Sequence, residues 1–89
     1  MTMMGANPDE LDRLGATLRR QIPQLDAVIG TAGTALDTTP WTGPARDRFV
    51  EAWQSQFVPA LRRLGEAFEA AGADCAQRAA ALRQVMGAG

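Results

Sequence analysis

Histidine, lysine and tyrosine are absent from this 89-residue chain, and cysteine occurs once, at Cys75. A single cysteine cannot form a disulfide within the chain. Without histidine, the sequence offers neither an ordinary zinc site nor a histidine-based catalytic triad. No nucleophile has a base beside it, and no glycine-rich loop follows a strand pattern. We therefore expect a protein that is not an enzyme and that binds no metal and no cofactor.

Charge and hydropathy exclude further classes of function. Ten acidic residues and nine arginines are spread along the chain, giving a net charge of −1. No basic stripe is present to neutralise phosphates, so we expect no nucleic-acid partner. No run approaches the roughly 18 apolar residues of a membrane span, and no helix has the dense cationic face of a membrane-surface helix. The start of the chain lacks the pattern of a signal peptide, so any export is expected to be leaderless.

A first helix is predicted from residue 8 to about residue 37, after a flexible tail over residues 1–6. Asn7 is suited to cap the first free N–H groups, and Pro8 to occupy the first helical turn. Apolar residues then recur at alternating steps of three and four, which places them on one helical face. This stripe comprises Leu11, Leu18, Ile22, Leu25, Ile29, Ala32 and Leu36, with Gly15 in the gap and with Leu14 and Val28 on one flank.

A second helix is predicted from about residue 44 to residue 86, followed by a tail over residues 87–89. Pro40 and the Gly43-Pro44 pair interrupt the helical pattern, and so short a connection implies antiparallel neighbours. Cys75 is interpreted as a small buried apolar residue rather than a reactive thiol. The predicted stripe is Val50, Phe57, Leu61, Leu64, Phe68, Ala71, Cys75 and Leu82, with Trp53 beside it. The fold class is therefore an all-α, two-helix antiparallel hairpin.

Each predicted helix contains an interior proline, Pro23 or Pro59, and each lies eighteen residues from Trp41. In a hairpin that turns at that tryptophan, the two prolines lie at about the same distance from the turn, one on each helix. We hypothesise that both helices bend together there, because proline removes a helical hydrogen bond. The alternative is coincidence.

The apolar arcs of both helices are wider than one mutual contact can cover, and an exposed remainder marks an interaction surface. We therefore expect two hairpins to dimerise into a four-helix bundle. The pattern does not say whether the second hairpin is the same chain or another. The predicted partner interface is Leu14, Leu18, Ile22, Leu25, Val28, Ile29, Val50, Trp53, Phe57, Leu61, Leu64 and Phe68.

The stretch Trp41-Thr42-Gly43, followed by small residues, an aromatic at Phe49 and a tryptophan at Trp53, resembles the WXG family. These are helical hairpins that include the early secreted antigenic target-like proteins, and the resemblance covers about residues 7–86. It implies export as a folded dimer by type VII (ESX) secretion, after recognition by a membrane-bound ATPase. It also implies that Trp41 and Gly43 form part of a recognition surface. A purely structural role in closing the hairpin tip is the alternative.

The chain departs from the family pattern in one respect. Many members carry a Tyr-x-x-x-Asp/Glu signal beyond the second helix, and this sequence has no tyrosine. We therefore expect a partner to carry the export signal. The leading expectation is a secreted substrate or co-substrate with a cytoplasmic pool before export. The alternatives are a cytoplasmic adaptor for a larger effector with a WXG-like domain, and a plain self-associating bundle.

Overall fold

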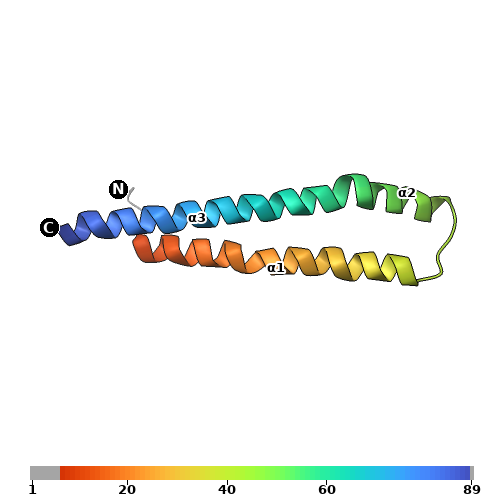
Figure 1. The fold of residues 1–89 in the computed structure, drawn as a ribbon, viewed down its shortest axis with the longest axis horizontal. Coiled ribbons are helices and arrows are strands. Elements are labelled where there is room, and N and C mark those ends of the chain that lie inside the picture. Colours follow the sequence, from red (N-terminus) through yellow and green to blue (C-terminus); the bar gives the residue numbers. More distant parts are fainter. Residues whose placement is uncertain (1–6, 89) are drawn as a thin grey trace.

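The structure is a computed structural model that describes residues 7–88, and the predicted tail over residues 1–6 lies outside them. It confirms an all-α antiparallel hairpin, with no strand in the described part of the chain (Figure 1). Helix α1 (Pro8–Thr38) forms one arm. The other arm is α2 (Pro44–Ala52), a five-residue π-helical turn, η1 (Trp53–Phe57), and α3 (Val58–Ala88). The molecule measures 67 × 21 × 16 Å, so it is only one helix thick.

Local sequence accounts for both ends of α1. The Asn7 side chain accepts a hydrogen bond of 2.8 Å from the Asp9 backbone N–H, and Pro8 occupies the first turn. At the other end Thr39 is extended, with φ −97° and ψ 128°, because the following Pro40 disfavours helical backbone there.

The connection between the arms ends at a glycine with a left-handed backbone. Gly43 has φ 118°, a value that residues with a Cβ rarely adopt, and Pro44 begins α2 directly after it. The second arm continues to Ala88, two residues beyond the predicted end at residue 86.

We call the contact between the two arms the seam. On α1 it matches the predicted stripe, from Leu11 to Leu36 in steps of four and three. Its tightest point is the crossing of Gly15 and Gly72, both buried. A Cβ added to Gly15 would lie 3.0 Å from the Gly72 carbonyl oxygen and 3.2 Å from the Cys75 Cβ. Cys75 and Ala79 are the buried apolar residues beside this crossing, so the predicted burial of Cys75 is confirmed.

The arms diverge from this end toward the turn (Figure 1). Between the crossing and the turn the seam contains larger side chains, among them Ile22, Phe68 and Trp53. Near the turn, Leu36, Val50, Trp53 and Val58 border a hollow of about 260 Å³ between the arms. The hairpin is therefore a wedge, and at its wide end large side chains border a hollow between the arms.

The predicted stripe of the second helix is wrong at three positions. Phe57, Leu64 and Ala71 are exposed, whereas their neighbours Val58, Gly65 and Gly72 face α1 and are half-buried or buried. The seam residues of the second arm are Val50, Trp53, Val58, Leu61, Gly65, Phe68, Gly72, Cys75, Ala79 and Leu82. Glycine at positions 65 and 72 lets α3 approach α1 closely, and an apolarity pattern does not register that preference.

The two interior prolines behave differently. The second arm changes helix type at Trp53–Phe57, a turn that ends two residues before Pro59, whereas α1 continues as an α-helix through Pro23. The π-helical turn thus accompanies Pro59 alone, and the joint bend of the two helices stays a prediction.

Candidate partner-binding surface

The hairpin has two long faces, one on each side of the seam. We call the first the charged face, because it carries the ion pairs that bridge the arms. Arg83 donates to Asp12 at 2.6 Å and to Asp9 at 2.7 Å, and the Arg19 Nε lies 3.7 Å from a Glu69 oxygen. The hydrogen bonds to the two aspartates raise the pKa of Arg83 above its ordinary value.

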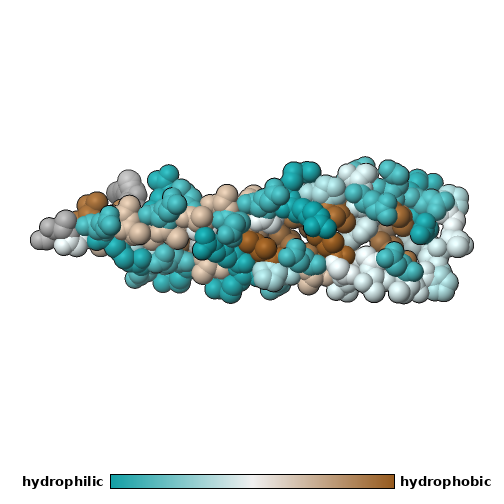
Figure 2. Space-filling view, in the orientation of Figure 1, coloured by the Kyte–Doolittle hydropathy of each residue, from teal (hydrophilic) through white to brown (hydrophobic). Residues whose placement is uncertain are grey.

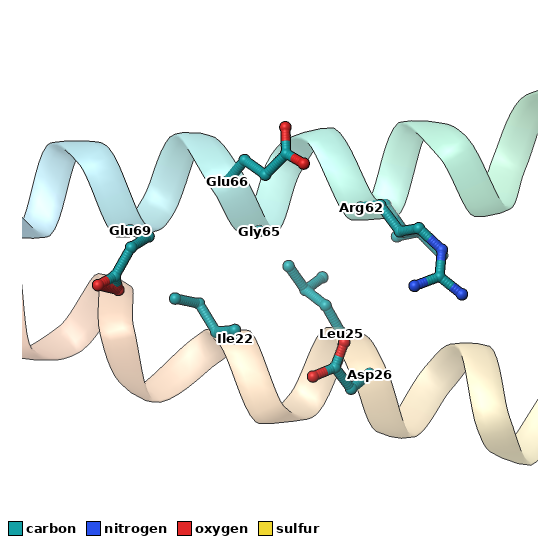
Figure 3. A pocket seen from close by; sticks show the side chains of 8 residues that line it. Ile22, Leu25, Asp26, Arg62, Gly65, Glu66 and Glu69 are labelled. Carbon is teal, nitrogen blue, oxygen red and sulfur yellow. The ribbon is translucent and has the colours of Figure 1, made fainter.

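The seam is visible in Figure 2 as hydrophobic atoms between rows of hydrophilic ones. On the charged face a shallow groove of about 430 Å³ opens into it (Figure 3). Ile22 and Leu25 point from α1 toward Gly65 on α3, whereas Glu66 points away from the groove. Asp26, Arg62 and Glu69 line its sides. The groove is thus an opening between arms that lack bulk at position 65.

The second face is apolar, and we call it the apolar face. Its six large side chains are between 40% and 72% exposed. They are Leu14, Val28, Phe49, Phe57, Leu64 and Val85.

Helical geometry places these six residues together. Four of them follow a seam residue by three positions, as Leu14 follows Leu11 and Leu64 follows Leu61. The other two, Phe49 and Phe57, each directly precede a seam residue, which places them on the same side. Each residue advances about 100° around a helix. All six residues therefore lie on one side of the seam, and residues that directly follow a seam residue lie on its other side. Equivalent positions of two antiparallel helices share a face. The contacts of Arg19 with Glu69 and of Arg83 with Asp12, all one residue after the seam, show this directly.

The apolar face is also free of charge over most of its length. From Thr17 to Ala35 the positions of α1 on this side are uncharged, and the same holds from Phe57 to Ala71 on the second arm. A shallow apolar hollow of about 630 Å³ lies along α1 around Val28. Charge appears only nearer the open end of the hairpin, where Arg78 pairs with Asp74 at 2.8 Å.

Four aromatic rings gather where this face meets the turn, and we call Trp41, Phe49, Trp53 and Phe57 the aromatic tip. Phe49 is its centre, with ring centroids 6.2 Å from Trp41, 6.2 Å from Trp53 and 6.3 Å from Phe57. The Phe49 and Trp53 rings are stacked, at 19°. Trp41 is 42% exposed, so the predicted motif residue lies on an accessible aromatic surface.

The predicted interface residues separate into two groups. Leu14, Val28, Phe57 and Leu64 lie on the apolar face. The other eight face the opposite arm and are half-buried: Leu18, Ile22, Leu25, Ile29, Val50, Trp53, Leu61 and Phe68. Phe49 and Val85 were missed as members of the exposed surface. Phe49 directly precedes the seam residue Val50, and Val85 follows the seam residue Leu82 by three positions. Both could have been predicted once the side of the second arm that faces α1 was known.

No protein-family model, curated protein or solved structure matches this chain. Within residues 7–88, no three potential metal-ligating side chains come together. No helix in the same range has both the length and the apolar character that a membrane crossing requires.

Proposed function

We propose that this chain is a non-enzymatic partner-binding protein, one half of a four-helix bundle completed by a second helical hairpin. The observation that carries the proposal is the apolar face. Six large apolar side chains from the two arms are exposed on one face, along a surface that is mostly uncharged. A continuous exposed patch of this kind is typical of a surface that a partner covers.

Energetics support the same conclusion. Among residues 7–87 the only apolar side chains that the hairpin buries are those of Cys75 and Ala79. A domain of this size needs additional burial, because chain entropy nearly cancels the gain from a small core. Complete burial of a large apolar side chain contributes about 1.5–3 kcal/mol, and a partner would supply the part of that burial that the hairpin leaves unmade. A second hairpin laid on the apolar face would supply the missing layer of core.

The resemblance to the WXG family gives the proposal its biological setting. Trp41 and Gly43 stand at the accessible tip of a helical hairpin, as that resemblance implies. We place the protein in type VII (ESX) secretion, as a small substrate or co-substrate that the secretion ATPase recognises through the dimer. The exposed, uncharged face suits a hairpin partner, whether a small WXG-type chain or the WXG-like domain of a larger effector.

The proposal is tested by co-expressing the chain with the product of the adjacent gene and comparing three variants. Leu64→Asp places a charge on the apolar face and should abolish co-purification while helicity is retained. Leu18→Asp places an unpaired charge in the seam and should unfold or dissociate the hairpin itself. Gln77→Asp, on an exposed position of α3, is the matched control and should change neither property.

Light scattering on the purified complex gives the mass of the assembly. A dimer of the chain with itself, or with the co-expressed hairpin, supports the proposal. A monomer that binds no helical partner, or a complex that survives Leu64→Asp unchanged, contradicts it.

A further inference from the structure

The π-turn of the second arm has a consequence for the apolar face. The seam residues of that arm recur in steps of three and four, except for the step of five from Trp53 to Val58, which spans the π-turn. There the Val58 N–H donates to the Trp53 carbonyl five residues earlier, one residue further than in an α-helix. The π-turn therefore absorbs one extra residue in the helix.

An extra residue in a continuous α-helix would turn the helix before it by about 100° relative to the helix after it. Phe49 would then leave the line of Phe57 and Leu64, and Trp53 would leave the seam. In the structure Phe49 and Phe57 lie on the same face, with ring centroids 6.3 Å apart. The aromatic tip is thus continuous with the apolar face.

We infer that the π-turn is an alignment device that joins the aromatic tip and the apolar face into one binding surface, covered by a single hairpin partner. The surface extends from Phe49 to Val85 on the second arm and includes Leu14 and Val28 on α1. A partner that covers it must be elongated, uncharged along the contact and as long as the hairpin, which another helical hairpin satisfies. The part of this inference that concerns the partner rests on the proposed function. The part that concerns alignment by the π-turn involves this chain alone.

The alignment is tested by changing the number of residues in the π-turn and measuring whether Trp53 stays in the seam. Trp41→Phe leaves Trp53 as the single tryptophan. Pro59→Ala removes the local effect of a missing N–H on the turn. In this double-variant background, acrylamide quenching of fluorescence reports the exposure of Trp53. Deletion of Gln56 removes the extra residue, so a regular α-helix can then keep every seam residue facing α1. Quenching of Trp53 should therefore be unchanged, and the melting temperature should be equal or higher.

Two controls give the opposite expectation. Insertion of one alanine after Gln56 adds a second extra residue, and should raise quenching about twofold as the half-buried Trp53 turns toward solvent. Deletion of Arg63, outside the π-turn, should lower the melting temperature, because Leu61 and Val58 are moved out of phase. If deletion of Gln56 destabilises the chain as much as deletion of Arg63, or if Pro59→Ala alone exposes Trp53, the inference is overturned.

The unity of the surface is tested with the co-purified partner, using Phe49→Asp at the tip and Leu64→Asp on the apolar face. Both should weaken the same complex by about 30-fold or more, as expected for buried anchor residues. Loss of binding with Leu64→Asp alone would refute a single surface and leave the proposed function intact. If neither change weakens the complex, the proposed function fails.

Discussion

Two glycines of α1 have opposite roles, although both stand inside the same helix. Gly15 lies at the crossing with Gly72, where a Cβ would meet backbone at 3.0 Å, a separation tighter than ordinary van der Waals contact. Around Gly30 an added Cβ would meet nothing within 4 Å. Gly15 therefore permits the close approach of the two arms, whereas Gly30 only lowers the helix propensity of α1.

Alanine at these two positions separates packing from helix propensity. Gly30→Ala should raise the free energy of unfolding by up to about 1 kcal/mol, because alanine is the better helix former. Gly15→Ala gains the same propensity but forces the arms apart, at a typical overpacking cost of about 1–3 kcal/mol. In thermal unfolding, Gly30→Ala should have a higher melting temperature than the parent, and Gly15→Ala should have a lower melting temperature than Gly30→Ala. Equal melting temperatures for the two variants would show that the crossing is not tightly packed.

At the scale of the helices, the open end of the hairpin is tied by one side chain. The Arg83 guanidinium bridges from α3 to Asp9 and Asp12 in the first turns of α1. Arg78 has comparable hydrogen-bond geometry, but its partner Asp74 lies on the same helix. Only the first arrangement holds the two arms together.

Arg83→Ala should lower the melting temperature more than Arg78→Ala, and the difference should shrink at 1 M salt, where the screening length falls to about 3 Å. The pKa of Arg83 is raised in the folded state, so its contribution is fully present below the unfolded-state pKa. It is lost only as pH rises through the still higher folded-state value. The contribution of the cation is therefore constant across the neutral range, and mutation is the suitable probe. An equal effect of the two substitutions at low salt would assign no special role to the bridge.

At the scale of the whole molecule, the hairpin is a wedge one helix thick, with the ion pairs that bridge the arms on one face and exposed large apolar side chains on the other. Ion pairs on an exposed surface tolerate water at little cost. Exposed leucine, valine and phenylalanine side chains are unfavourable in water, so a partner would stabilise the apolar face more than the charged face. The tip, with Trp41 on its surface, lies at the wide end of the wedge.

The proposed function predicts that Trp41→Ala impairs export and recognition more than folding, because Trp41 is 42% exposed and lies outside the helices. The unfolding temperature should change little, whereas the amount of protein secreted through the type VII pathway should fall. Trp41→Phe keeps an aromatic ring against Phe49 and serves as the milder control. Normal secretion of Trp41→Ala would confine the residue to closing the hairpin tip.

Local rules and periodicity were enough to predict most of the fold. Asn7 and Pro8 predict the start of α1, Pro40 and Gly43 predict the break, and the apolar residues of α1 predict its seam. Each depends on backbone preferences or on a spacing within one helix. These properties are encoded in neighbouring residues, and the sequence by itself determined them.

Only the tertiary structure decided which side of the second arm faces α1. The sequence allows two choices of the residues by which the second arm faces α1, and both contain Leu61, Phe68, Cys75 and Leu82. The choices differ in whether the seam adds the residue three positions or the residue four positions after each of these. Apolarity favours Leu64 and Ala71, but close packing against α1 selects Gly65 and Gly72, because bare backbone lets the helices touch. That choice requires the π-turn at Trp53–Phe57 and places Phe57 and Leu64 on the outer face. The composition of the apolar face thus follows from contacts between residues far apart in the chain.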